Sequence, residues 1–311
     1  MIASQPPAGV QQAAGPIAPA PTAASEQGED AAELQARIKR LVESPSYRQA
    51  DEDASFLQRP EMCGVRLQLD FWKTEEILQR RRIDQTVVVY GSTRLVEPGK
   101  AHQRLDGARR ALDAFPNDAE CVRELAVAER LYDKSAFYLV ARELGNLIGR
   151  SEATSALPKL TVVTGGGPGI MEAANRGAYE TGAASVGLNI SLPHEQLPNP
   201  YLSPDLCFRL HYFAIRKLHL LERAKAAVFF PGGYGTCDEL FEVLTLLQTG
   251  KIRPLPVLLV GEAFWRRALD IDFLIDEGMI TPADAKLFVY AETAPHIWAA
   301  IRAWYERDGL R

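Results

Sequence analysis

Short apolar runs alternate with longer amphipathic segments from residue 86 onward. The clearest runs are rich in valine, leucine and isoleucine and span residues 86–90, 159–164, 184–190, 226–230 and 255–260, with weaker runs at 207–212 and 287–292. Because the runs are continuous, they indicate strands that are buried on both faces. Such strands between helical segments predict an α/β fold with a doubly wound, mostly parallel, Rossmann-like sheet flanked by helices.

Two segments do not follow this alternation of strands and helices, and both are predicted to be helical. Residues 31–82 are polar and helix-forming, with breaks at Pro45 and Pro60, so we expect an N-terminal helical extension. Residues from about 95 to 130 form a long stretch rich in Ala, Arg and Glu, interrupted at Pro116, which predicts a helical insert. The sheet domain itself is expected to occupy residues 83–311.

The first 30 residues are biased toward Ala, Pro, Gln and Gly, and we expect them to be a disordered tail. They lack the basic flank and compact apolar core of a secretory signal. No apolar run in the chain approaches the ~20 residues that span a bilayer. We therefore expect a cytoplasmic protein without a membrane partner.

The composition is that of an ordinary globular protein: 311 residues, of which 47% are hydrophobic and 24% charged. The formal net charge of −5 argues against general binding to nucleic acid or to membrane surfaces, because both need a basic face. A small phosphorylated ligand remains compatible with this charge. The four cysteines and the histidines His194, His211 and His219 show no metal-ligand spacing, so we expect no metal site.

Three strand-to-helix turns are rich in glycine and follow apolar runs. Their residues are Gly91 and Ser92; Gly165, Gly166 and Gly167; and Gly232, Gly233, Tyr234, Gly235 and Thr236. Ligands of such sheets bind beyond the carboxyl ends of the strands, where bare amides and helix N-termini attract anions. One glycine turn alone is explained by tight packing, but three at the same edge predict a phosphate site. None contains the P-loop lysine, so hydrolysis of nucleoside triphosphates is not expected.

Glu239 follows the third turn and admits two interpretations. Thr236 and Glu239 match a Thr-x-x-Glu capping box, in which the carboxylate would bond a helix amide. Alternatively, Glu239 serves chemistry, although a carboxylate beside a phosphate loop would repel the phosphate itself. It would be better placed near a sugar carbon that becomes cationic, or near the water that attacks it.

Arg216 and Lys217 are adjacent in an apolar helical segment that includes Phe213, Leu218 and Leu220. These neighbours predict a substantially buried helix. Two basic groups in such a helix need a partner, which an anionic ligand would provide. A pair of side chains that extend to solvent at a helix end is an equally compatible explanation.

Together these residues resemble the Lonely Guy family of cytokinin riboside 5′-monophosphate phosphoribohydrolases. The family pattern Pro-Gly-Gly-x-Gly-Thr-x-x-Glu is met at 231–239, and the preceding Arg-Lys pair at 216–217. A close variant of Gly-Gly-Gly-x-x-Gly-x-Met lies at 165–171. The likeness covers about residues 84–306 and is strongest to the longer bacterial branch.

The resemblance implies hydrolysis of a nucleoside 5′-monophosphate, a cytokinin riboside monophosphate or AMP, to free base and ribose 5-phosphate. It implies catalytic roles for Arg216 and Glu239, no metal or organic cofactor, and a homodimer or higher homo-oligomer. The implied substrate-binding residues are Gly91, Ser92, Gly165, Gly166, Gly167, Glu195, Lys217, Gly232, Gly233, Tyr234, Gly235, Thr236 and Thr245.

Two alternatives stay open. The enzyme could be a broader purine or pyrimidine 5′-monophosphate nucleosidase that serves nucleotide turnover. From a different class, it could be a non-catalytic nucleotide or molybdenum-cofactor carrier on the same scaffold. The presence of both Arg216 and Glu239 favours catalysis, because a carrier needs the glycine turns but not this pair.

Overall fold

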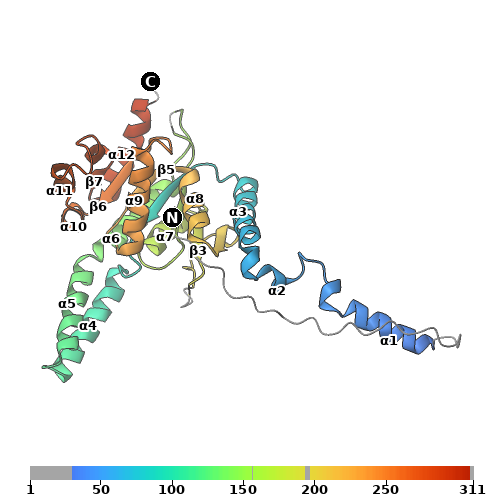
Figure 1. The fold of residues 1–311 in the computed structure, drawn as a ribbon. Helices are drawn as coiled ribbons and strands as arrows, with labels where there is room; N and C mark the ends of the chain where they lie inside the picture. The colour runs from blue at the N-terminus through green and yellow to red at the C-terminus, as the bar shows by residue number, and fades with distance from the viewer. Residues whose placement is uncertain (1–29, 156, 193–196, 309–311) are drawn as a thin grey trace. The chain divides into compact units, whose positions relative to one another are not determined.

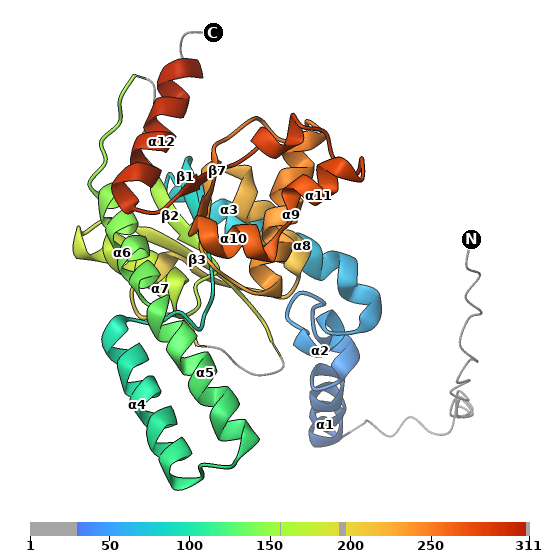
Figure 2. The same cartoon turned by 90° about the vertical axis from the view of Figure 1, so that its left-hand side faces the viewer.

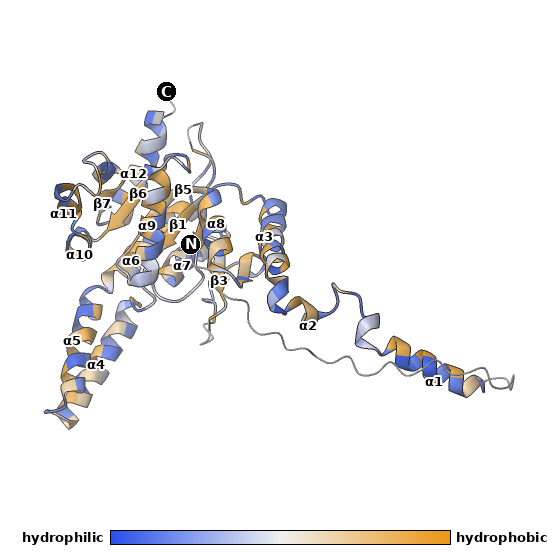
Figure 3. Ribbon diagram, viewed as in Figure 1, coloured by the Kyte–Doolittle hydropathy of each residue, from blue (hydrophilic) through white to orange (hydrophobic). Residues whose placement is uncertain are grey.

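A computed structural model describes residues 30–155, 157–192 and 197–308 of the chain. Its contacts divide the chain into two compact units, residues 1–59 and 60–311. In the first unit, the described part contains α1 (Ala31–Val42), a 3₁₀ turn (Pro45–Tyr47) and α2 (Ala54–Leu57). The side chains of Asp30 and Asp53 accept amide hydrogen bonds at the starts of α1 and α2. Figure 3 shows α1 with one apolar and one polar side.

A parallel sheet organises the second unit. The strands lie in the order β4-β3-β2-β1-β5-β6-β7, and each neighbouring pair is parallel. Their bounds are β1 (Thr86–Tyr90), β2 (Thr161–Thr164), β3 (Ser185–Ile190), β4 (Cys207–Leu210), β5 (Ala224–Phe229), β6 (Val257–Val260) and β7 (Val289–Ala291). The predicted doubly wound fold is confirmed, and the two weaker apolar runs form the edge strands β4 and β7. The order of strands reverses between β1 and β5, where such folds bind ligands.

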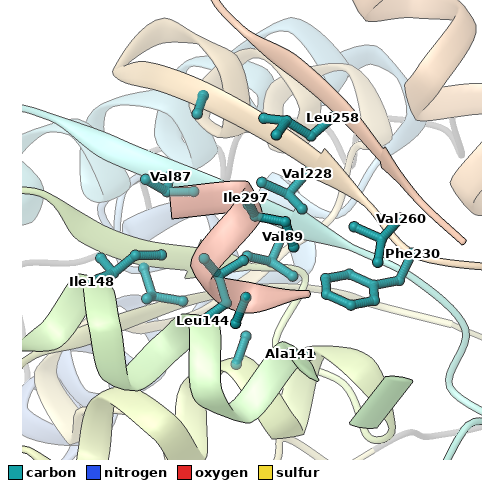
Figure 4. Close-up of a cluster of buried hydrophobic side chains, with 14 of the residues drawn as sticks. Val87, Val89, Ala141, Leu144, Ile148, Val228, Phe230, Leu258, Val260 and Ile297 are labelled. Atoms are coloured by element: carbon teal, nitrogen blue, oxygen red, sulfur yellow. The ribbon is translucent and has the colours of Figure 1, made fainter. Parts of the chain in front are cut away.

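Alternating residues of β1 point into two hydrophobic cores, one on each face of the sheet. Val87 and Val89 belong to a core covered by α6 (Ala136–Gly149), α7 (Ile170–Glu180) and α12 (Ala294–Asp308). Figure 4 shows Leu144 of α6 and Ile297 of α12 against the strands in this core. Burial on both faces explains why the strand sequence is a continuous apolar run.

The second core covers the opposite face of the sheet. Val88 of β1 packs there with residues of the helices α3 (Cys63–Arg80), α8 (Phe213–Glu222), α9 (Tyr234–Gln248) and α10 (Glu262–Ala268). Short helical elements complete the unit: α11 (Ile271–Asp276) and 3₁₀ turns at Pro60–Met62, Pro204–Leu206 and Asp284–Lys286. None of the helices in the described ranges has the length and apolar composition needed to cross a bilayer.

Helices α4 (Pro98–Ala114) and α5 (Ala119–Asp133) lie side by side and project from the sheet region as a hairpin (Figures 1 and 2). The connection contains Pro116 and Asn117, and Asp118 caps α5 by accepting a hydrogen bond from the Glu120 amide. Pro116 and Asn117 thus separate the two helices, and Asp118 marks the start of the second. Both helices lie in or next to the segment for which the sequence predicted a helical insert.

Helices α6 and α7 pack backbone to backbone through two glycines. A Cβ added to Gly177 would lie 1.9 Å from the Arg142 carbonyl oxygen, and one added to Gly145 would lie 2.1 Å from the Ala174 carbonyl oxygen. Both distances are too short for any side chain, so these glycines set the separation of the two helices. Because α7 begins just after the second glycine turn, this packing also fixes the position of that turn.

Gly177→Ala should lower the free energy of unfolding by about 1–3 kcal/mol, because the two backbones must separate. The matched control is Gly107→Ala in α4, where no atom lies within 4 Å of the added Cβ. That substitution should raise the free energy of unfolding by about 0.5–1 kcal/mol through the better helix propensity of alanine. Urea unfolding measures both changes, and equal effects would contradict the close packing.

Candidate active site

A cleft of about 380 Å³ opens at the carboxyl ends of β1, β2 and β3 and at the start of α9. This is the sheet edge at which the strand order reverses. Nine of the predicted site residues line the cleft: Gly91, Ser92, Gly165, Gly167, Arg216, Gly233, Gly235, Thr236 and Glu239. All three glycine turns therefore meet at one cavity, together with the acidic and basic groups expected beside them.

Five other predicted residues lie close by without lining the cleft. Gly166 is buried within the second turn, and Tyr234 is 97% exposed at the start of α9. A Cβ on Gly232 would lie 2.2 Å from the Thr236 hydroxyl oxygen, so Gly232 is bare because Thr236 packs against it. The Thr245 hydroxyl donates to the Phe241 carbonyl inside α9, 2.7 Å away. The remaining members of the predicted set are Lys217, described below, and Glu195, which lies outside the described residues.

Backbone hydrogen bonds tie the three turns together. The Ser92 amide donates to the Pro231 carbonyl at 3.0 Å, which links the first turn to the third. The Ile170 amide donates to the Ser92 carbonyl at 3.2 Å, which links the second turn to the first. Gly169 has φ of +74°, and a Cβ there would lie 2.4 Å from the Ser92 carbonyl oxygen. The glycine at 169 is thus required by both its conformation and this close approach.

A buried network of side-chain hydrogen bonds stabilises the second glycine turn. Asn199 donates from its side-chain amide to the carbonyls of Gly166 and Gly167 at 3.2 and 3.1 Å, and to the Asn175 side-chain oxygen at 3.0 Å. The Thr164 hydroxyl bonds the same Asn175 oxygen and accepts from the Gly166 amide. Sequence analysis missed Asn199, whose only signal is its place between two prolines in a loop.

Arg216 and Glu239 form a buried ion pair in the cleft. The Arg216 guanidinium Nη2 donates to Glu239 Oε1, and the two side chains are only 14% and 10% exposed. Burial raises the pKa of the Glu239 carboxyl, while the Arg216 charge acts in the opposite direction. The Arg216 guanidinium also lies 5.4 Å from the Phe213 ring centroid.

This geometry decides between the two interpretations of Glu239. Helix α9 begins at Tyr234 with Gly233 as its N-cap, so Thr236 lies inside the first turn rather than at the cap position. The Glu239 carboxylate is directed to Arg216 on α8 and not back to its own helix start. The capping-box interpretation is therefore wrong for this residue.

The structure also corrects two expectations about α8. The Lys217 ammonium lies 2.7 Å from Asp238 Oδ2 and 3.3 Å from Glu242 Oε2, and Arg216 pairs with Glu239. Both basic groups thus have carboxylate partners on α9, so neither needs an anionic ligand to balance its charge. These partners were not apparent because they come from a different helix.

The second correction concerns the burial of α8. Phe213 and Leu218 are 51% and 44% exposed, so the helix is not buried on all sides. Leu220 and Leu221 are buried against the sheet, as the apolar pattern predicted.

Tyr90 is a cleft residue that sequence analysis took only as part of a strand. It ends β1, is 3% exposed, and its ring stacks on that of Phe229 with centroids 4.6 Å apart. Burial raises the pKa of its phenol well above the usual range, and the Glu239 charge adds to this effect. Tyr90 therefore stays neutral beside the Arg216–Glu239 pair.

The site combines two chemical capacities. The amides of the glycine turns and the N-terminus of α9 attract an anion, because helix N-termini carry partial positive charge. A buried carboxylate lies in the same cavity, in contact with a guanidinium. Part of the remaining wall is apolar, with Met171, Ile190 and Leu192 among its residues.

A family model described as "Possible lysine decarboxylase" matches residues 171–301. A cytokinin riboside 5′-monophosphate phosphoribohydrolase of Arabidopsis thaliana is 30% identical over 170 residues, which cover 53% of this chain and 74% of the relative. A pyrimidine/purine nucleotide 5′-monophosphate nucleosidase of Escherichia coli K12 is 34% identical over 151 residues. That match covers 43% of this chain and 30% of the nucleosidase.

Two further similarities are weaker. A probable cytokinin riboside 5′-monophosphate phosphoribohydrolase of Oryza sativa subsp. japonica is 29% identical over 148 residues, or 44% of this chain and 64% of the relative. Among solved structures, the X-ray structure titled TM1055 covers 70% of this chain and 99% of its own, at 20% identity and a TM-score of 0.39.

Asn199→Ala should lower the free energy of unfolding by about 1–3 kcal/mol, because it removes three buried hydrogen bonds and leaves the Gly167 carbonyl without its donor. The control is Asn189→Ala at the same cleft, whose side chain makes a weak contact with Cys207 Sγ at 3.8 Å. That change should stay within about 0.5 kcal/mol. Urea unfolding of both variants, with hydrogen exchange at the Gly166 amide, tests the role of Asn199. Similar losses in the two variants would contradict it.

Proposed function

Because the chain belongs to the family of cytokinin riboside 5′-monophosphate phosphoribohydrolases, we propose that it hydrolyses the N-glycosidic bond of a nucleoside 5′-monophosphate. The products would be the free base and ribose 5-phosphate. The observation that carries this proposal is the buried Arg216–Glu239 pair in the same cleft as three glycine turns.

The glycine turns support binding of the 5′-phosphate. Gly233, Gly235 and Thr236 line the cleft at the N-terminus of α9, where the first amides of a helix have no helical partners. Gly91 and Gly165 bring two more backbone segments to the same cavity. A phosphate held here would fix the position of the ribose attached to it.

Glu239 supplies the negative charge that the reaction needs. Cleavage of an N-glycosidic bond passes through an oxocarbenium-like state, in which the anomeric carbon becomes positively charged. An ionised carboxylate can stabilise that cation or accept a proton from the attacking water. The water oxygen then bonds the anomeric carbon, and the departing base takes the electron pair of the broken bond and a proton.

Arg216 keeps Glu239 ionised and in position. Without a cation, burial alone would favour the neutral acid, which could neither stabilise the sugar cation nor activate water. Arg216 also lines the cleft, so the same guanidinium can contact the phosphate or the leaving base. Lys217 is proposed to bind substrate less directly, through the carboxylates it holds on α9.

The apolar side of the cleft supports an adenine-type base. Ile190, Leu192 and Phe213 contribute apolar surface, and the last two are partly exposed at the opening. A flat base can pack there, and an alkyl substituent on the base would extend the contact. We therefore propose cytokinin riboside 5′-monophosphates and AMP as substrates, and with them a role in cytokinin biosynthesis or nucleotide turnover.

The alternative of a non-catalytic carrier has less support. A carrier of nucleotide or molybdenum cofactor needs the glycine turns to hold its ligand, and these are present. It has no use for a carboxylate that is kept ionised in the binding cavity, because that charge repels a bound phosphate. The Arg216–Glu239 pair therefore favours the enzyme.

Glu239→Gln should lower the rate of base release by about 10²–10⁴-fold, because the amide carries no charge to stabilise the sugar cation or to accept a proton. The assay measures free base from AMP and from a cytokinin riboside 5′-monophosphate. The matched control is Glu262→Gln, an exposed glutamate that pairs with Arg266 at the start of α10. It should keep the full rate, and an active Glu239→Gln variant would refute the proposal.

The pH profile of the same assay gives a second readout. The rate needs ionised Glu239, so it falls as the pH drops through the pKa of that carboxyl, which burial raises above its ordinary value of 4.5. Removing the cation in Arg216→Met raises this pKa further. The residual rate of that variant should therefore fall off at a higher pH than the rate of the unmodified enzyme.

We further propose that the protein is a cytoplasmic homodimer or higher homo-oligomer. Apolar side chains exposed on two neighbouring helices support this: Phe213 and Leu218 on α8, and Phe241 on α9. Leu218→Glu should shift the mass measured by light scattering toward the monomer, because it places a charge in the interface. Met279→Glu, at an exposed apolar residue away from these helices, is the control. A monomeric unmodified protein at micromolar concentration would contradict the proposal.

A further inference from the structure

A second cluster of polar side chains lies between α3 and α8, in the packed part of the molecule. It contains Glu75 of α3 and His219 and Glu222 of α8. One ligand atom from each of these side chains lies within 4.8 Å of the other two. Neither the nucleotide chemistry nor the sequence patterns described above account for this cluster.

The side chains of Glu75 and His219 are buried, and each has a polar atom without a hydrogen-bond partner within the described ranges. The His219 side chain is fully buried, and its Nδ1 and Glu75 Oε2 lack a hydrogen-bond partner among the described residues, while the imidazole also lies against the Phe71 carbonyl. The nearest approach, from His219 Nδ1 to Glu75 Oε2, is 3.8 Å, which is too long for a hydrogen bond. Such atoms are costly to bury unless something binds between them.

The surroundings hold Glu75 in a fixed orientation. Its other oxygen, Oε1, accepts hydrogen bonds from Arg223 and Gln79, both at 2.6 Å. The Phe71 ring stacks on His219 with centroids 5.1 Å apart. Outer contacts of this kind fix metal-ligating side chains and leave the inner oxygen free to bind an ion.

Distances and charge both suit a divalent cation. His219 Nδ1 lies 3.8 Å from Glu75 Oε2 and 3.9 Å from Glu222 Oε2, near the ~3.4 Å that tetrahedral metal bonds of ~2.1 Å would give. Arg223 contacts both carboxylates, with its Nη1 3.4 Å from Glu222 Oε2, and one cation against two carboxylates leaves the cluster with a net negative charge.

We propose that Glu75, His219 and Glu222 bind one divalent transition-metal ion, with zinc(II) as the metal that fits this donor set. One imidazole nitrogen and two carboxylate oxygens are common zinc ligands. Glu222 is 45% exposed and, with Arg223, lines a cavity of about 590 Å³, through which an ion can enter. Sequence analysis expected no metal site, because Glu75 lies far along the chain from His219 and Glu222.

The ion would have a structural role. It would join α3 to α8 at His219, one helical turn after Arg216. It would thereby fix the helix that carries the guanidinium of the cleft, without taking part in the reaction. The proposal stands apart from the nucleotide chemistry, and each can fail without the other.

The experiment titrates the metal-depleted full-length protein with cobalt(II) and follows the d–d absorption bands that report inner-sphere ligands. We expect saturation at one equivalent and displacement by zinc(II). Glu222→Gln and His219→Gln should each weaken zinc binding at least ten-fold. Glu222 is partly exposed, so we expect Glu222→Gln to fold normally. This variant therefore tests the site even if substitution of the buried His219 disturbs the fold.

The matched control is His211→Gln. His211 lies 3.5 Å from Asp70, a residue of α3, which also carries Glu75. The His211 side chain is exposed, and in the described part of the chain the pair belongs to no group of three possible metal ligands. It should bind zinc as the unmodified protein does. Zinc should also raise the melting temperature of the unmodified and His211→Gln proteins, but not that of Glu222→Gln, because it binds only the folded state.

Two results would overturn the proposal. One is the absence of saturable binding at one equivalent. The other is a loss of affinity in His211→Gln as large as that in Glu222→Gln, which would indicate binding to surface groups. All these measurements use the metal alone, so they do not depend on the nucleotide reaction.

Discussion

The candidate active site depends on one buried ion pair, Arg216 with Glu239. Pairs of this kind contribute little net stability, because desolvation of both charges offsets their attraction. An apolar pair of similar size would hold α8 against α9 at least as well. Ion pairs with a desolvated partner in a cleft are typical of sites where charge is used. The Arg216 charge opposes the neutralisation of Glu239 that burial favours.

The sheet topology brings this pair to the anion-binding turns. Parallel strands end at one edge, and the reversal between β1 and β5 separates the helices that follow them. The backbone bonds from Ser92 to Pro231 and from Ile170 to Ser92 then join the three turns into one surface. The proposed phosphate site is thus a property of backbone geometry, whereas the proposed chemistry depends on two side chains. Changes of side chain could therefore alter the chemistry without altering the backbone turns.

The fold was largely predictable from the sequence because strands buried on both faces need continuous apolar runs, and the glycine turns mark where those strands end. The side-chain partners were not predictable. Lys217 meets Asp238 and Glu242 because α8 and α9 pack together, and no spacing within either helix reveals that contact. Asn199 was missed for a related reason, since its amide bonds carbonyls of a distant turn. Helix periodicity also overstated the burial of α8, because it does not reveal which side a neighbour covers.

Helix α8 is held by directional contacts on two sides. Arg216 reaches α9 in the cleft, and Arg223, which directly follows the last residue of the helix, donates a hydrogen bond to Glu75 of α3. Apolar packing fixes the distance between helices but tolerates small rotations, because dispersion contacts have no preferred angle. Polar contacts at both ends of the same helix remove that freedom. Arg216, which we propose to meet a carboxylate and a nucleotide at once, needs this precision, and the buried polar residues on the α3 side help to provide it.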